Sequence, residues 1–473
     1  MTAMRAVLIS CALMMAPAVA AKDAEVRITV AADKPAWTIS KLLTGMHTVY
    51  GHEPDALWEN PQVIQWLKQA KVGTIRYPGG TAVQTWHWDN PNGISFQSDS
   101  WDPHYKDTPR DPELWMDLGE YIALCRKIGA EPMVGINIRS GQKFKRERDS
   151  LQSARRLIQH CVAKGYGVKL WYIGNECYKG WSAESYAKAI DEYAAVLKRV
   201  DPNITIIGDW KFGPESAHRF DQAIQIALRS KQLDVLEIHE KYVLEKRFGL
   251  TKDGYNSTSV KGWQSEGGLY HGRLDFYIEK FYAEMEKHRR SVKLAFNEWA
   301  ATNETPYLTA LTKADYLISM FKHPVFSACD WTTSRHVGAP ILFNFQTSTL
   351  KGFGPAAAMY PMFAQAMGGR HLPMTSSAQN VYGFAARCGE QDVQIYLLNK
   401  RSEAVDARID LSGAPARGLH VETESFVEPG KIVKAPPKDV ESPAALKIPL
   451  PPLSFTRIVL STPAPAPKEV KKP

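Results

Sequence analysis

Short apolar runs alternate with helical patterns along this sequence, and the alternation recurs eight times between residues 41 and 371. The pattern predicts buried strands at 44–50, 72–77, 132–138, 169–173, 204–208, 235–239, 292–296 and 325–331. Amphipathic helices are predicted at 111–128, 150–164, 182–199, 214–230, 274–288 and 308–322, with a last one at 356–367. Eight such repeats predict an α/β fold, the (β/α)8 TIM barrel. A doubly wound open sheet also alternates, but it normally needs a phosphate-type glycine loop that this sequence lacks.

The rest of the sequence predicts a second, all-β module. From residue 372 the helical pattern stops, and residues 393–399, 404–411 and 454–460 alternate as antiparallel strands, so 372–461 is expected to form a C-terminal β-sandwich. The segment 21–40 contains a strand at 26–30 that is expected to join it. Residues 41–371 then form the barrel, and the Pro/Ala/Lys-rich tail at 462–473 is predicted to be disordered.

Residues 1–20 have the pattern of a secretory signal peptide. Arg5 supplies the positive n-region, residues 6–16 the apolar region, and residues 18–20 a small-x-small cleavage site. No stretch approaches about 18 consecutive apolar residues, so no membrane span is predicted. The expected location is therefore secreted or periplasmic. Cys11 lies in a stretch that resembles a lipoprotein cleavage box, and its lipidation stays open.

Charge and cysteine content exclude several classes of partner. The net charge of +8 falls to +5 without Arg5 and the tail at 462–473, and this remainder contains no dense basic run. Nucleic acid is therefore not an expected partner, although an acidic polymer is mildly favoured. Without Cys11 five cysteines remain, an odd number with no metal-type CxxC spacing, so neither a disulfide framework nor a metal site of that type is expected. No cofactor is expected.

Two of the predicted strands end in the same dipeptide, Asn-Glu. Asn175-Glu176 follows the fourth strand, and Asn297-Glu298 follows the seventh. A carboxylate at the end of a buried strand is costly to desolvate unless a site uses it, although polar loop residues also normally begin there. Catalytic groups of a barrel lie at the C-terminal ends of its strands. Since the fourth and seventh strands lie nearly opposite, the two carboxylates are expected to converge across the barrel mouth.

Other polar and aromatic residues also fall at predicted strand ends: His47, Arg76, Asn137, Asp209, Trp210, His239, Trp299, Asp330 and Trp331. Paired carboxylates among tryptophans indicate glycoside hydrolysis. In that reaction one carboxylic acid protonates the leaving oxygen and the other carboxylate attacks or activates water, while aromatic faces cover sugar rings. Structural interpretations remain for several of them, because Arg76 can pair with an acid, His239 can be a core histidine, and Asp209 can cap a helix.

The motifs resemble glycoside hydrolase clan A, and most of all its family 51 α-L-arabinofuranosidases. The resemblance rests on Gly-Asn-Glu at 174–176, Phe-Asn-Glu-Trp at 296–299, Ile-Arg-Tyr-Pro-Gly-Gly at 75–80 with Trp-His-Trp-Asp at 86–89, and Ile-His at 238–239 with Tyr242. It implies Glu176 as acid/base, Glu298 as nucleophile and Asn175 as a contact to the sugar 2-hydroxyl. Together with the strand-end positions, the resemblance predicts five further substrate contacts: Arg76, His239, Tyr242, Trp299 and Trp331.

Three departures from the family pattern leave the sugar open. Thr48-Val49 stands where the family usually has a glutamate, Thr81 where it has an asparagine, and Ala356 nearest an expected glutamine. The expectation is a secreted retaining glycoside hydrolase, α-L-arabinofuranosidase-like, that acts on plant or microbial polysaccharide or oligosaccharide.

Two kinds of alternative remain beside that expectation. One is another clan A glycosidase, such as a β-xylosidase, a β-glucuronidase or an endo-acting enzyme, and the other is a non-catalytic carbohydrate-binding barrel. A metal-dependent hydrolase is disfavoured, since no His-x-His cluster lies on a strand. Exo or endo action and the oligomeric state stay open.

Overall fold

The computed structural model describes residues 25–90, 99–106, 116–211, 217–241, 263–264, 267–301, 303–335, 338–389, 392–413, 418–441 and 446–461. The expected signal peptide with Cys11, the tail at 462–473, and Tyr242 lie outside these residues. Among the helices that are described, none has the length and apolarity to cross a membrane.

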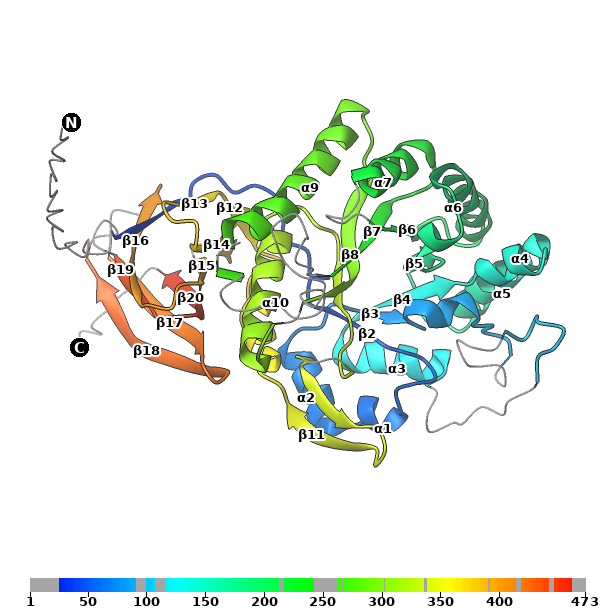
Figure 1. Cartoon of the computed structure of the whole chain (residues 1–473), viewed down its shortest axis with the longest axis horizontal. Coiled ribbons are helices and arrows are strands. Elements are labelled where there is room, and N and C mark those ends of the chain that lie inside the picture. Colours follow the sequence, from blue (N-terminus) through cyan, green and yellow to red (C-terminus); the bar gives the residue numbers. More distant parts are fainter. Residues whose placement is uncertain are drawn as a thin grey trace, which may run out of the picture.

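Eight strands close into a parallel barrel in chain order (right in Figure 1). They are β2 (Gly45–His47), β3 (Thr74–Tyr77), β4 (Glu131–Ile136), β5 (Leu170–Ile173), β6 (Thr205–Trp210), β7 (Val235–Lys241), β8 (Lys293–Ala300) and β9 (Ala328–Asp330). The predicted (β/α)8 barrel is confirmed, with each predicted strand in its expected place. The strands are short and nearly all buried, because side chains fill the barrel and helices cover its outside.

The helices around the barrel largely follow the predicted order. They are α1 (Asp55–Trp58), α2 (Pro61–Gln69), α3 (Leu118–Ile128), α4 (Arg139–Lys143), α5 (Glu147–Ala163), α6 (Ala183–Lys198), α7 (Ala217–Arg229), α9 (Gly267–Lys287), α10 (Pro306–Phe321) and α11 (Ala356–Ala364), with the 3-10 turns η1 (Gly80–Gln84) and η2 (Cys177–Lys179). Of the helix predicted at 111–128, residues 111–115 lie outside the described residues, Met116 and Asp117 are not helical, and Leu118–Ile128 form α3. Helix α3 begins after Asp117, because that side chain accepts from the Glu120 amide and Glu120 accepts from the Asp117 amide, which forms a capping box.

Two packed sheets form the C-terminal module (left in Figure 1), and the predicted β-sandwich is confirmed. One sheet has the order β13-β1-β16-β19 and the other β12-β14-β15-β20-β17-β18. Strand β1 pairs in parallel with β16 and antiparallel with β13, so the N-terminal strand completes a sheet of this module. A separate hairpin of β10 and β11 follows the barrel. The bounds are β1 (Val26–Ala31), β10 (Ile341–Asn344), β11 (Thr349–Phe353), β12 (Arg370–Leu372), β13 (Met374–Ser376), β14 (Val381–Cys388), β15 (Asp392–Asn399), β16 (Val405–Ser412), β17 (Leu419–Val427), β18 (Lys431–Val440), β19 (Lys447–Leu450) and β20 (Ser454–Ser461).

An aromatic cluster joins the barrel to the sandwich. Phe363 of α11 stacks on Phe455 of β20 with ring centroids 4.6 Å apart, and it also contacts Phe321 of α10 and Phe384 of β14. All four rings are buried. A buried apolar contact of this kind favours one fixed arrangement of the two modules over relative motion.

A buried carboxylate ties the chain after β2 to the chain after β9. Glu53 accepts from the Val49 amide at 2.9 Å and from the Ser334 hydroxyl at 2.8 Å. Burial raises the pKa of Glu53 more than these hydrogen bonds lower it, and the result is a pKa of about 7. The folded protein therefore holds a proton on Glu53 at a pH where an unfolded glutamate has lost it.

The first prediction concerns the interface between the modules. Phe363→Ala should destabilise the protein by about 3–5 kcal/mol, because it removes a buried aromatic ring and leaves a cavity. The measurement is the free energy of unfolding from urea denaturation. Phe276→Ala is the matched control, since Phe276 is 55% exposed on α9 and its loss should change stability by no more than about 0.5 kcal/mol. Equal losses in the two variants would contradict a packed interface.

The second prediction concerns the pH dependence of stability. A raised folded-state pKa contributes stability that is complete below the unfolded pKa of Glu53 and is lost as the pH rises through about 7. Glu53→Gln removes this titration, so its stability relative to the natural protein should rise by up to about 3 kcal/mol between pH 4.5 and pH 8. Urea denaturation at both pH values measures the difference. The same difference at both would show that Glu53 does not titrate with folding.

Candidate active site

A sharp turn after β5 presents Glu176 at the barrel mouth. Gly174 has a φ of +77°, and a Cβ there would lie 2.5 Å from the Cys177 sulfur, so the turn requires glycine. Glu176 itself has a φ of +50°, a conformation that costs a non-glycine residue energy and clusters at functional sites. The buried carboxylate of Asp209 accepts from the Cys177 amide at 3.3 Å and so holds the turn in place.

Glu298 reaches the same mouth from β8. Its side chain is buried, and its Oε2 atom has no hydrogen-bond partner among the described residues. This oxygen lies 3.5 Å from Nδ1 of His239 and 3.7 Å from Nη1 of Arg76. Nearby positive charge offsets the cost of burying a carboxylate, and Oε2 keeps lone pairs that no donor uses among the described residues.

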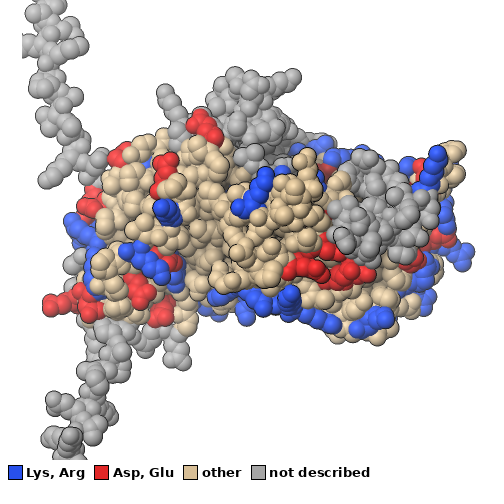
Figure 2. Space-filling view, turned by 90° about the horizontal axis from the view of Figure 1, so that it is seen from below, with Lys and Arg blue, Asp and Glu red and all other residues tan. Residues whose placement is uncertain are grey.

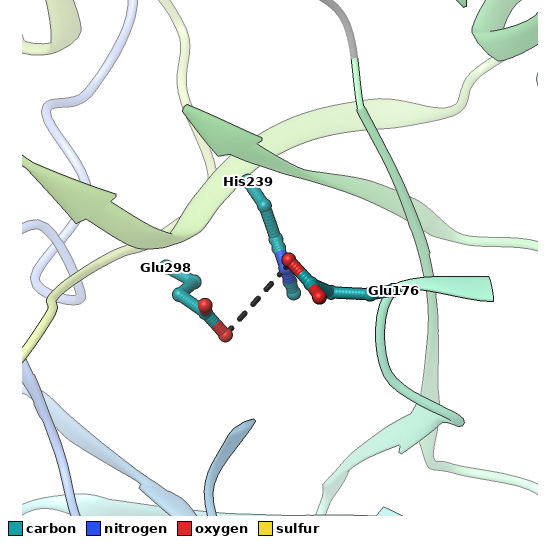
Figure 3. A group of neighbouring side chains, drawn as sticks. All are labelled: Glu176, His239 and Glu298. Carbon is teal, nitrogen blue, oxygen red and sulfur yellow. Dashed lines mark ion pairs between the residues drawn. The ribbon is translucent and has the colours of Figure 1, made fainter. Parts of the chain in front are cut away.

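Glu176, His239 and Glu298 form one compact cluster (Figure 3). One carboxylate oxygen of each glutamate and one ring nitrogen of His239 all lie within 4.8 Å of one another. His239 Nδ1 faces both acids, with 3.9 Å to Glu176 Oε1. The carboxylates of Glu176, after β5, and Glu298, near the end of β8, therefore converge across the barrel mouth. Three such groups could also hold a metal ion, but the Arg76 cation, 3.7 Å from Glu298, would repel one.

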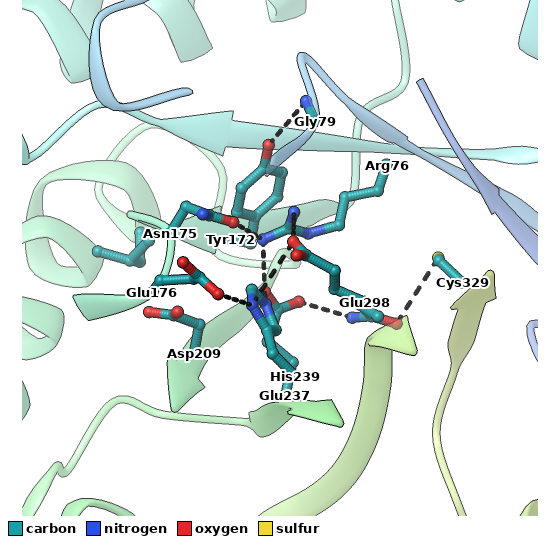
Figure 4. Close-up of polar contacts among 12 residues, drawn as sticks. Arg76, Gly79, Tyr172, Asn175, Glu176, Asp209, Glu237, His239, Glu298 and Cys329 are labelled. Carbon is teal, nitrogen blue, oxygen red and sulfur yellow. Dashed lines mark hydrogen bonds and ion pairs between the residues drawn. The ribbon is translucent and has the colours of Figure 1, made fainter. Parts of the chain in front are cut away.

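A buried network around Arg76 supports this cluster (Figure 4). One guanidinium nitrogen donates to Glu237 at 2.7 Å and to Asn175 at 3.0 Å, and the guanidinium carbon lies 3.9 Å from the centre of the Tyr172 ring. Burial raises the pKa of Glu237, but the charge of Arg76 and the hydrogen bond to His239 lower it more, to about 2. Glu237 is thus a permanent negative charge that neutralises Arg76 and has no proton to donate.

His239 in the cluster and His47 beside it have pKa values shifted in opposite directions. Burial lowers the pKa of His239, but the charge of Glu298 and the hydrogen bond to Glu237 raise it more, so the pKa lies above its ordinary value. Burial and the Arg76 charge hold the pKa of His47 well below its ordinary value. Neutral His47 accepts from Arg76 at 3.0 Å. Of the two histidines, His239 therefore binds a proton more readily, and it faces both candidate catalytic carboxylates.

Glu176 and Glu298 lie in different surroundings. The Glu176 side chain is 16% exposed, against 7% for Glu298. Tyr178 donates its hydroxyl to Glu176 at 2.5 Å, and Lys179 pairs with the other carboxylate oxygen. Two carboxylates in one site take different roles when their environments differ in this way.

Among the predicted substrate contacts, Asn175 has an unpaired donor and Trp331 has exposed surface. Asn175 is buried, and its Nδ2 donor has no partner among the described residues. Trp331 follows β9, is partly exposed, and meets the His47 ring edge-on at 4.5 Å between centroids. His239 belongs to the cluster, and Arg76 lies beside it, 3.7 Å from Glu298. Tyr242 lies outside the described residues.

The prediction for Trp299 does not fit its position. Its side chain is 1% exposed and stacks on Tyr316 of α10, with ring centroids 5.1 Å apart. Successive residues of a strand point to opposite faces, so an inward-facing Glu298 turns Trp299 outward against the helices. Trp299 is therefore a packing residue in this structure, and its faces are not available to a sugar.

Sequence reasoning missed Glu237, Tyr172, Tyr178 and Gln84 as members of the site. A signal for Glu237 was present, because a lone acid within the apolar run Val235–His239 must find a partner once buried. Nothing in the sequence marked Gln84, which donates to the Asn175 carbonyl at 2.6 Å. That contact depends on how η1 folds over the end of β5.

Comparison of the sequence with known proteins finds arabinofuranosidases. No family model matches the chain. It is 29% identical to α-L-arabinofuranosidase C of Emericella nidulans over 183 residues, which cover 33% of each protein. It is 24% identical to the intracellular exo-α-(1→5)-L-arabinofuranosidase of Streptomyces lividans over 276 residues, which cover 52% of this chain and 38% of the relative. The chain thus spans only about a third of the length of these relatives.

Solved structures show the same fold over nearly the whole chain. The GH51 arabinofuranosidase from Xanthomonas axonopodis pv. citri superposes with a TM-score of 0.72 and 17% identity, covering 92% of this chain and all of that one. CelM2, a bifunctional glucanase-xylanase from a metagenome library, gives a TM-score of 0.68 and 15% identity, with 93% and 99% covered. At these identities the likeness shows the fold alone. In motifs, sequence similarity and fold together, the chain resembles clan A glycoside hydrolases, and most of all the family 51 α-L-arabinofuranosidases.

Proposed function

We propose that this protein is a retaining glycoside hydrolase that releases α-L-arabinofuranose from plant or microbial polysaccharide or oligosaccharide. The observation that carries the proposal is the approach of the Glu176 and Glu298 carboxylates to within 4.8 Å at a barrel mouth. Retaining glycosidases hold their two carboxyl groups about 5–5.5 Å apart, whereas inverting enzymes need about 6.5–9.5 Å to admit water. The short separation therefore favours double displacement.

The roles follow from what each carboxylate contacts. Glu298 attacks the anomeric carbon with its unpaired Oε2 while Glu176 protonates the glycosidic oxygen, so the leaving group departs as an alcohol and an ester to Glu298 forms. Glu176, now deprotonated, takes a proton from water, and the water oxygen attacks the anomeric carbon. The ester bond to Glu298 then breaks and the sugar is released. Tyr178 fixes the orientation of Glu176 through its hydrogen bond.

Neighbouring donors serve the same reaction. The charge of Arg76 and the neighbouring His239 ring, whose pKa Glu298 raises, stabilise the anionic nucleophile before attack and after release. The free Nδ2 donor of Asn175 is the proposed contact to a sugar hydroxyl, and the exposed part of Trp331 is the proposed surface for a sugar ring. Secretion or export to the periplasm also belongs to this proposal, and it rests on the pattern of residues 1–20.

Two departures from the family pattern bear on the identity of the sugar. Val49 is partly exposed and Thr81 is exposed in η1, so neither supplies the acid or amide that the family pattern has there. Another clan A activity, such as that of a β-xylosidase, a β-glucuronidase or an endo-acting enzyme, is therefore the second candidate. The shared fold of CelM2 is consistent with it.

The third prediction separates the two glutamates. Glu298→Ala should lower kcat by roughly 10⁴-fold or more on every substrate. Glu176→Ala should lower it by about 10²–10⁴-fold on glycosides with poor leaving groups but much less on a dinitrophenyl glycoside, whose departure needs no proton. Glu192→Ala, which changes an exposed acid on α6, is the control and should keep full activity. Equal losses on good and poor leaving groups in Glu176→Ala would contradict its role as the acid.

The fourth prediction concerns the substrate and the stereochemistry. Aryl glycosides of arabinofuranose, xylose, galactose and glucuronic acid should be cleaved with the highest kcat/KM for α-L-arabinofuranoside. Proton NMR during turnover should show that the first-formed sugar has the anomeric configuration of the substrate. An inverted product would refute the nucleophile role of Glu298. Faster cleavage of another sugar would select the second candidate, and no cleavage of any would favour a carbohydrate-binding barrel.

A further inference from the structure

A pocket of about 410 Å³ opens beside Glu176. Glu176 and Asn175 line it, whereas Glu298 does not. The acid of a glycosidase protonates the oxygen of the leaving group, while the nucleophile approaches from the other side of the sugar. A pocket that borders the acid and not the nucleophile is therefore placed to receive the leaving group.

The wall of this pocket carries positive charge. Arg139 and Lys143, both on α4, line it together with Gln84 and Trp181. Arg139 donates to the Gln84 side chain at 2.8 Å, and Gln84 donates to the Asn175 carbonyl at 2.6 Å, so the guanidinium is connected to the turn that presents Glu176. No carboxylate of the described residues forms an ion pair with Arg139. Its remaining donors are available to a ligand.

One segment of the chain concentrates positive charge, contrary to the expectation that the sequence contains no dense basic run. Residues 139–164, which include α4 and α5, contain eight lysines and arginines and two acids, so this segment carries +6 of the net charge of +8. Basic side chains, with a few acidic ones among them, gather at the end of the molecule that α4 and α5 form (right in Figures 1 and 2). The pocket beside Glu176 opens next to this basic segment.

We propose, given the glycosidase function above, that this pocket is a leaving-group subsite for a uronate, so that the enzyme removes its sugar from an acidic glycan. Arg139 binds the sugar carboxylate through its planar guanidinium. Lys143 contributes less, because its ammonium already lies 3.7 Å from the Asp102 carboxylate. Trp181 offers an apolar surface to the sugar ring. The basic surface of α4 and α5 attracts further uronates of the same polymer. The released sugar itself carries no charge in this scheme, which distinguishes it from a glucuronidase.

The test compares two disaccharides that differ in one group. In one, the sugar to be released is linked to a uronic acid, and in the other to the same residue after reduction of its carboxyl group. The natural protein should cleave the acidic substrate with a kcat/KM about tenfold higher. This ratio should fall as salt is added, because partly exposed charges are screened.

Charge-removing variants identify the side chain that gives the preference for the acidic substrate. Arg139→Gln should bring the ratio of kcat/KM values close to one, Arg139→Lys should retain part of it, and Lys143→Gln should lower it by a smaller factor. Lys431→Gln makes the same change of charge on the exposed surface of β18 in the sandwich and should leave the ratio unchanged. Circular dichroism checks that each variant is folded.

The outcomes distinguish this subsite from the function on which it rests. A ratio of one in the natural protein, or a ratio that Arg139→Gln does not change, overturns the subsite, while cleavage of aryl glycosides still supports a glycosidase. Equal effects of Arg139→Gln and Lys431→Gln also overturn it, because they would show a response to net charge alone. Failure to cleave any glycoside, neutral or acidic, contradicts the proposed function itself.

Discussion

The buried ion pair between Arg76 and Glu237 is the interaction on which the rest of the site depends. It joins β3 to β7 across the barrel, and both side chains are fully buried. Removal of one partner would leave an uncompensated charge inside the protein, at a cost of about 3–5 kcal/mol. The same guanidinium holds Asn175 next to Glu176 and lies 3.7 Å from Glu298. The ion pair therefore fixes the residues on which the proposed chemistry relies.

Three carboxylates lie close together in this site, and their partners separate their roles. Glu237 is neutralised by Arg76 and stays ionised. Glu298 is buried with an oxygen free for bonding and has Arg76 and His239 beside it, as a nucleophile requires. Glu176 is more exposed, is held by Tyr178 and borders the pocket on the leaving-group side, as an acid/base requires. In the proposed mechanism, these three different environments assign three distinct roles to the same chemical group.

The sequence was sufficient for the barrel, the sandwich and the approach of Glu176 to Glu298, because strand periodicity sets which chain ends meet at a barrel mouth. It was not sufficient for contacts between distant segments. The partner of Arg76 lies 161 positions away, and the β7–β8 register shifts between Glu237 and His239, so simple strand alternation does not predict their directions. The orientation of Trp299 and the pocket under α4 likewise depend on tertiary packing.

Double displacement requires that Glu298 form a covalent bond to the sugar, and a mechanism-based label detects this bond. A 2-deoxy-2-fluoro-arabinofuranosyl substrate with a good leaving group slows both steps but favours accumulation of the glycosyl–enzyme ester. Mass spectrometry of the digested protein should then find one added sugar on the peptide that contains Glu298, and none after Glu298→Ala. A label on another residue, or an unlabelled protein that still turns over aryl arabinofuranosides, would contradict the account.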